Sequence, residues 1–121
     1  MGTTALTPDT FDAQVESSGV TIIDFWASWC GPCLNFAPIY EEAAKKFSAH
    51  FFGKVDTEKF KDLAAKLGIK AIPTLMIYRD GFLLFNEAGA LPARELEKLV
   101  ELIERVDMNA VRTEMSGAVQ S

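Results

Sequence analysis

The stretch Val20-Thr21-Ile22-Ile23-Asp24-Phe25-Trp26 is followed by Ala27-Ser28-Trp29-Cys30-Gly31-Pro32-Cys33, which contains both cysteines of the 121-residue chain. The first run is apolar almost throughout, as expected of a central strand that is covered on both faces of its sheet. The second run places two thiols at positions i and i+3, where the strand ends and a helix begins. Because two thiols at this spacing can form a disulfide and reopen it, the stretch predicts a strand–helix junction with a redox centre.

Other uses of a Cys-x-x-Cys pair can be excluded by counting. A structural zinc site needs four thiolate or imidazole ligands, and the chain has two cysteines and a single histidine, His50. Haem attachment requires a histidine directly after the second cysteine, and this chain has Leu34 there. The remaining interpretation is a redox dithiol that works without a metal or a cofactor.

The composition fits one globular domain. With 121 residues, of which 49% are hydrophobic, the chain can build a single core. A net charge of −5 gives no basic surface for nucleic acid or an anionic membrane, and no apolar run reaches the roughly 18 residues that span a bilayer. The first residues, Met1 to Leu6, lack the pattern of a signal peptide. We therefore expect a cytoplasmic protein, or an extracytoplasmic one if a signal peptide has been removed.

Hydrophobic periodicity and turn signals predict eight elements in the order α, β, α, β, α, β, β, α. The expected helices cover 7–17, the segment from the cysteines to about 47, 60–67 and 92–106, and the expected strands cover 20–26, 51–55, 74–78 and 82–85. This order predicts an α/β fold with a central mixed β-sheet flanked by helices on both faces. In such a fold the loop that carries the cysteines lies at the carboxyl end of a central strand, where open α/β sheets place their sites.

From about Leu6 to Ile103 the chain resembles the thioredoxin family. The matching residues, in order along the chain, are Asp24 to Cys33, Ala37-Pro38, Lys54, Ile72-Pro73-Thr74, Asp80-Gly81 and Gly89-Ala90. The resemblance implies a thioredoxin fold, which we assign to residues 1–106. Residues 107–121 form a C-terminal extension, for which helical spacing predicts a further helix to about Met115 and then a disordered end.

The two cysteines are expected to have different roles. Free backbone N–H groups at a helix start favour an anion, so Cys30, ahead of the helix, is expected to be the exposed thiolate that attacks a substrate disulfide. Cys33, one turn inside the helix, then resolves the mixed disulfide. Gly31-Pro32 between them allows the tight turn into the helix.

Asp24 is the second candidate for catalysis. A carboxyl in an apolar strand has its pKa raised by burial, and it can then accept a proton from a nearby thiol. The resemblance implies that Asp24 accepts the proton of Cys33 and that Lys54 is a charged group near Asp24. The alternative is a structural carboxyl that anchors backbone or pairs with Lys54.

The resemblance also implies a flat, apolar surface for docking of substrate proteins beside the cysteines. Isolated X–Pro bonds are mostly trans, but the resemblance implies a cis bond at Pro73, packed against the cysteines. Trp29 would flank the reactive thiol. The expected surface consists of Trp29, Gly31, Pro32, Ile72, Pro73, Gly89 and Ala90.

These features predict a protein-disulfide reductase that carries electrons from a thioredoxin reductase to substrate proteins with disulfides and contributes to cell redox homeostasis. We expect it to act as a monomer. One alternative is a disulfide oxidant or isomerase of the same fold in an extracytoplasmic compartment, but the Gly-Pro pair without histidine between the cysteines favours reduction. The other alternative is a non-redox binding module, against which the intact Cys30–Cys33 pair with Asp24 and Pro73 argues.

Overall fold

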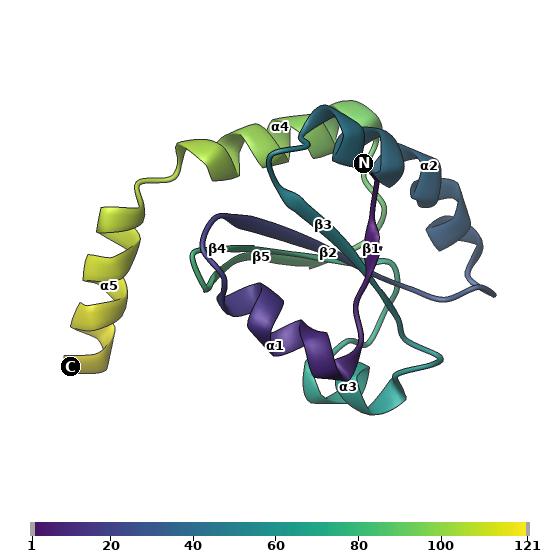
Figure 1. Ribbon diagram of the computed structural model, residues 1–121, viewed down its shortest axis with the longest axis horizontal. Helices are drawn as coiled ribbons and strands as arrows, with labels where there is room; N and C mark the ends of the chain where they lie inside the picture. The colour runs from purple at the N-terminus through teal and green to yellow at the C-terminus, as the bar shows by residue number, and fades with distance from the viewer. Residues whose placement is uncertain (1, 121) are drawn as a thin grey trace.

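The computed structural model describes residues 2–120, and side chains within residues 2–115. Five strands and five helices follow one another along this part of the chain (Figure 1). They are β1 (Thr4–Ala5), α1 (Pro8–Glu16), β2 (Val20–Trp26), α2 (Gly31–Lys46), β3 (Phe51–Asp56), α3 (Lys61–Lys66), β4 (Thr74–Arg79), β5 (Phe82–Ala88), α4 (Ala93–Arg105) and α5 (Met108–Gln120).

The strands form one mixed sheet in the order β1-β3-β2-β4-β5. β2 is the middle strand: it pairs parallel to β3 and antiparallel to β4. β4 and β5 form an antiparallel hairpin, whose turn places Asp80 and Gly81 at positive φ. The predicted α/β fold with a central mixed sheet is confirmed, and its central strand is the one that leads to the cysteines.

Helices cover both faces of the sheet, α2 and α4 on one side and α1 and α3 on the other (Figure 1). Neighbouring residues of β2 therefore point into different cores. Ile22 packs with Phe36 and Tyr40 of α2 and with Leu96 of α4, whereas Ile23 packs with Phe11 of α1. Because successive side chains of a strand alternate between faces, a strand with a core on each side must be apolar at nearly every position.

Tyr40 fixes α2 against the centre of the sheet. Its side chain is fully buried, and its hydroxyl oxygen lies 3.0 Å from the Ile22 carbonyl oxygen and 2.7 Å from that of Gly53. The single hydroxyl proton is thus shared between a carbonyl acceptor of β2 and one of β3 at a fully buried position. This contact sets the position of the helix that carries both cysteines.

The structure adds β1 to the predicted elements. β1 has only two residues, both exposed, and it pairs parallel to β3 at one edge of the sheet. So short a strand leaves no hydrophobic alternation in the sequence. The bounds of the other elements agree with the prediction to within about three residues, and β5 differs most, because it continues to Ala88.

The expected helix beyond residue 106 is present as a separate helix, α5, and it extends past Met115 to Gln120. Val106 has extended backbone (φ −62°, ψ 133°) and ends α4. Asp107 then caps the new helix, since its Oδ1 accepts hydrogen bonds from the N–H groups of Asn109 and Ala110. The expected disordered end falls, for Ser121, outside the described residues.

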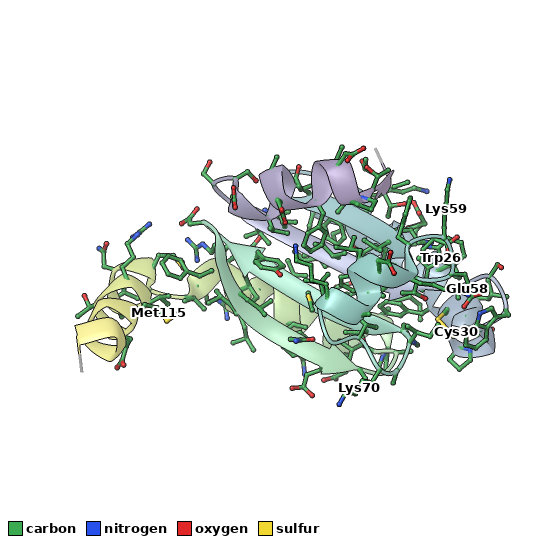
Figure 2. All side chains as sticks on the ribbon, turned by 90° about the horizontal axis from the view of Figure 1, so that it is seen from below. Trp26, Cys30, Glu58, Lys59, Lys70 and Met115 are labelled. Atoms are coloured by element: carbon green, nitrogen blue, oxygen red, sulfur yellow. A yellow bond between two sulfur atoms is a disulfide. The ribbon has the colours of Figure 1, made fainter. Side chains whose placement is uncertain are left out.

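α5 projects from the body at the end opposite the cysteines (Figures 1 and 2). The break before it is held by Arg79 at the end of β4, whose Nη1 donates to the carbonyl oxygens of Ile103, Glu104 and Val106 at 2.8 to 3.1 Å. None of the helices in residues 2–120 has the length and apolar composition needed to cross a membrane.

We expect Met108→Ala to lower the free energy of unfolding by about 2 kcal/mol, because Met108 is only 7% exposed and its removal leaves a cavity. Met115→Ala is the matched control: this methionine of the same helix is 50% exposed, and we expect a change below about 0.5 kcal/mol. Denaturant melts of the two variants measure both values. Equal, small effects would show that α5 does not dock on the domain.

Candidate active site

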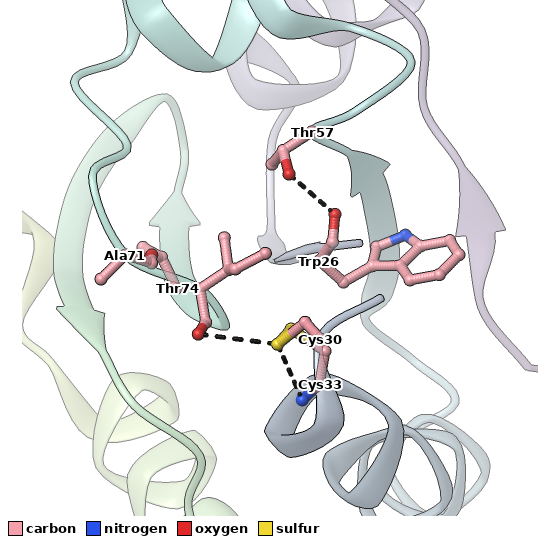
Figure 3. Close-up of a disulfide and its surroundings, with 7 residues drawn as sticks. Trp26, Cys30, Cys33, Thr57, Ala71 and Thr74 are labelled. Atoms are coloured by element: carbon pink, nitrogen blue, oxygen red, sulfur yellow. Dashed lines mark hydrogen bonds between the residues drawn. A yellow bond between two sulfur atoms is a disulfide. The ribbon is translucent and has the colours of Figure 1, made fainter. Parts of the chain in front are cut away.

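The cysteines lie at the carboxyl end of the central strand, between β2 and α2 (Figure 3). The turn that leads to them is closed by the Cys30 N–H, which donates to the Ala27 carbonyl oxygen at 3.2 Å. Cys30 and Cys33 form a disulfide with their Cα atoms 5.2 Å apart. The structure therefore shows the oxidised state of the predicted redox pair.

Cys30 is the N-cap residue of α2, and its Sγ accepts a hydrogen bond from the Cys33 N–H at 3.2 Å. This N–H is one of the donors that a helix start leaves without a backbone acceptor. The helix dipole and this donor stabilise a negative charge on the Cys30 sulfur. The same contact is available to the thiolate once the disulfide opens.

Both cysteines are buried in the oxidised protein, Cys30 at 4% exposure and Cys33 at 2%. The expectation that Cys30 is exposed is therefore wrong for this state, because Ala27, Trp26 and Ile72 pack around the pair. The two cysteines still differ in their access from the surface, because Cys30 lines a surface groove and Cys33 does not.

The loop before β4 closes over the disulfide. The Ile72–Pro73 peptide bond is cis, as the family resemblance implied, and the Ile72 carbonyl oxygen lies 3.8 Å from Cys30 Sγ. The loop is held in turn by the Thr74 hydroxyl, which donates to the Ala71 carbonyl oxygen at 2.5 Å (Figure 3). These contacts place Ile72 directly beside the sulfur that is expected to react.

Gly89 joins this loop from the end of β5. Its N–H donates to the Pro73 carbonyl oxygen at 2.7 Å, and its φ of +113° is one that residues with a side chain rarely adopt. Gly89 and the adjacent Ala90 are both exposed. The structure therefore brings Gly89 next to Pro73, as the docking surface predicted from sequence requires.

The face beside Cys30 is hollowed into a groove of about 560 Å³ rather than flat. Trp29, 67% exposed, lies along it. Gly89 and Ala90 are not part of this groove, and Gly89 is joined to the loop beside it by its hydrogen bond to Pro73. The lining residues are Trp29, Cys30, Gly31, Pro32, Thr57, Lys61, Ala64, Ala65, Ile69, Lys70, Ala71 and Ile72.

The sequence prediction did not include the part of the groove that comes from Thr57 to Ala71. Thr57 also holds the end of β2, since its N–H and its hydroxyl both donate to the Trp26 carbonyl oxygen, at 2.9 and 3.0 Å. These residues lie well away from the cysteines in sequence and carry no motif. Only the position of α3 next to the start of α2 could have identified them.

Asp24 lies in the middle of β2 and is 1% exposed. Neither of its carboxylate oxygens has a hydrogen-bond partner within the described residues. Burial raises the pKa of Asp24 from 3.8 to about 7, and the positive charge of Lys54 limits the rise. A buried carboxyl that titrates near neutral pH can give up and take up a proton under physiological conditions.

Lys54 is the β3 residue paired with Asp24 in the sheet register. It forms no ion pair with Asp24 in the part of the chain that the structure describes. Instead its Nζ lies over the Trp26 ring, 4.7 Å from the ring centroid, a favourable site for a cation. Lys54 thus acts on Asp24 through its charge and not through a direct contact, and the paired structural carboxyl that we considered is not observed.

No group of three or more metal-ligating side chains occurs in the described residues. The groups that the structure does bring to this site are the sulfur pair, the helix start that stabilises a thiolate, and one buried carboxyl with a pKa near neutrality.

Comparisons with known proteins agree with this geometry. The family model described as Thioredoxin matches residues 2–104. A Streptomyces coelicolor protein named as a thioredoxin is 46% identical over 110 residues, covering 91% of this chain and 82% of its own. Thioredoxin 1 of Synechococcus elongatus is 40% identical, covering 80% and 92%. Among solved structures, a mutant thioredoxin from Halobacterium salinarum superposes with a TM-score of 0.79 at 25% identity, covering 88% and 94%.

The fold and the Cys30–Cys33 pair define a thiol–disulfide oxidoreductase that uses its own dithiol. The chain belongs to the thioredoxin family, whose members act on protein disulfides and are re-reduced by a reductase. The family match ends at residue 104, and our boundary after residue 106 stays a prediction.

We expect Asp24→Asn to change how stability depends on pH. Because the pKa of Asp24 in the folded protein, about 7, exceeds its ordinary value of 3.8, the folded state binds the proton more tightly than the unfolded state. The natural protein therefore loses stability as the pH rises from about 4 to about 7 and no further above that. This loss amounts to roughly 4 kcal/mol, and the variant lacks it.

Denaturant melts of the oxidised proteins across this pH range provide the measurement. Asp12→Asn, which removes an exposed carboxyl on α1, is the control. We expect the stability of this variant to keep the pH dependence of the natural protein. If the difference between the natural protein and Asp24→Asn is the same at every pH, the carboxyl does not titrate in this range.

Proposed function

We propose that the protein is a reductase of protein disulfides in which Cys30 attacks and Cys33 resolves. The observation that carries this assignment is the asymmetry of the pair: Cys30 caps α2 and lines the groove, whereas Cys33 is buried one turn inside the helix. A substrate sulfur entering the groove meets Cys30 first.

The proposed reaction has two exchange steps. The Cys30 thiolate attacks one sulfur of a substrate disulfide, the substrate S–S bond breaks, and its other sulfur leaves as a thiolate. The Cys33 thiolate then attacks the Cys30 sulfur, which releases the second substrate thiolate and closes the Cys30–Cys33 disulfide. Two electrons pass from the protein to the substrate, and a reductase must return them.

Asp24 is proposed to accept the proton that Cys33 loses before the second step. A base works best when its pKa lies near the working pH, and burial gives the Asp24 carboxyl a pKa of about 7. With no hydrogen-bond partner in the described part of the chain, its oxygens are free to take up a proton. Lys54, held over the Trp26 ring, supplies the charge that keeps this pKa from rising further.

The proposed substrate surface surrounds Cys30. Trp29, Gly31, Pro32 and Ile72 line the groove together with it. Pro73, joined to Gly89 by a hydrogen bond, continues the surface to Ala90. An extended substrate segment crossing this surface runs beside the backbone of Ile72, so main-chain contacts hold it irrespective of its sequence.

We further propose that the protein works in the cytoplasm as an electron carrier. Gly31 and Pro32 carry no positive charge that could stabilise the Cys30 thiolate, so only the helix start stabilises the reduced form. A reduced form that is less stabilised gives a more negative reduction potential, which favours a reductase. The reduction potential of the Cys30–Cys33 couple tests this. A value more negative than the cytosolic glutathione pool, about −240 mV, supports the proposal, and a value above about −180 mV indicates an oxidant instead.

Single cysteine variants test the order of attack. We expect Cys30→Ser to abolish reduction of insulin, because the sulfur that substrates reach is lost. Cys33→Ser keeps the attacking thiol but cannot resolve, so it should accumulate as a mixed disulfide with the substrate. Mass spectrometry of each variant after mixing with insulin distinguishes them, and adducts on Cys30→Ser but not on Cys33→Ser would reverse the two roles.

A further inference from the structure

The groove beside Cys30 carries charge of one sign. Its only charged lining residues in the described part of the chain are Lys61 and Lys70. The chain as a whole has a net charge of −5. The approach to the reactive sulfur is therefore locally cationic on a protein that is otherwise acidic.

Both lysines keep their charge available to a partner. Lys61, the first residue of α3, is highly exposed, and its Nζ lies 3.8 Å from an exposed Glu58 carboxylate. An exposed pair at this distance is weak and leaves the Lys61 ammonium free to move toward a partner, but the Glu58 carboxylate offsets part of its field, so Lys70 contributes the larger share of the positive field in the groove. Lys70 is exposed and has no ion pair within the described residues, and it extends outward near the Cys30 end of the molecule (Figure 2).

Lys70 is also close in sequence to a residue that lies beside the reacting sulfur. It lies two residues before Ile72, whose carbonyl oxygen is 3.8 Å from Cys30 Sγ. A substrate segment that passes Ile72 on its way to the sulfur therefore runs close to the Lys70 backbone. Acidic side chains a few residues from the substrate cysteine come within reach of this ammonium group.

Between the two lysines the groove is lined by apolar and small side chains. Ala64 and Ala65 of α3 leave space that larger residues would fill, and Trp29 and Ile69 add apolar surface. Together with the lysines, these residues form a groove that accepts an apolar side chain and attracts negative charge on either side of it.

We propose that Lys61 and Lys70 select substrates: the groove takes an extended segment of a partner protein with an apolar side chain near its disulfide and Asp or Glu residues flanking it. This inference rests on the proposed function, since the groove matters only if Cys30 attacks substrate disulfides. Selection by charge at the rim acts mainly on the rate of association, and it weakens as salt screens the charges.

The test uses three peptides that contain the same internal disulfide and the same apolar neighbour, flanked by two Asp, two Ser or two Lys residues. Pre-reduced protein is mixed with each oxidised peptide, and the second-order rate constant of a single turnover is measured after acid quenching. Each constant is divided by that for attack by cysteamine, whose reacting form carries an ammonium group as well as the thiolate and so has no net charge, which removes differences in the peptides' own reactivity.

We expect the Asp peptide to react about tenfold faster than the Lys peptide at low ionic strength, and the ratio to approach one at high salt. The double variant Lys61→Gln/Lys70→Gln should lower this ratio to about two or less at low salt. Lys98→Gln, an exposed lysine of α4 that does not line the groove, is the control and should preserve both the ratio and the rates.

The outcomes separate this inference from the proposed function. If no peptide is reduced, the proposed function itself fails. If all three peptides are reduced at equal normalised rates at low salt, or if the double variant keeps the natural ratio, the protein is a reductase without charge selection and the inference is overturned.

Discussion

Burial of the central strand on both faces is the constraint on which the rest of the structure depends. β2 pairs with a strand on each side and packs against helices above and below, so neither its edges nor its faces reach water. Such a strand cannot shift its register without moving two cores at once. Its carboxyl end is therefore a fixed point, and the chain leaves it through Ala27 and Cys30 into α2.

The one ionisable side chain in that strand's interior has a cost. A carboxyl at position 24 is held where solvent and hydrogen-bond donors are both absent in the described structure, and the raised pKa of Asp24 expresses the penalty for its charge. An apolar residue there would avoid this cost. That the strand carries a carboxyl with a pKa near neutrality, at the expense of stability, is the feature on which its proposed role in proton transfer rests.

The sequence predicted those parts of the molecule that have a local signal. Continuous apolar character identified β2, helical spacing identified α2 and α4, and the Cys30–Cys33 pair identified the site. It missed the features that have no local signal. β1 is too short to carry a pattern, and the groove residues contributed by α3 have no motif. The burial of Cys30 was also missed, because Ile72, far along the chain, covers a sulfur whose neighbours in sequence are exposed.

The same arrangement explains how one surface can serve both attack and release. In the oxidised state the Cys30 sulfur faces the Ile72 carbonyl oxygen on one side and the Cys33 N–H on the other. Cys30 lines the groove, whereas Cys33 lies one turn inside the helix, so in the proposed mechanism a substrate sulfur and the Cys33 sulfur reach Cys30 from different directions. In that mechanism the substrate need not leave its proposed backbone contacts before resolution, and the bound segment departs as a thiolate once the internal disulfide has closed.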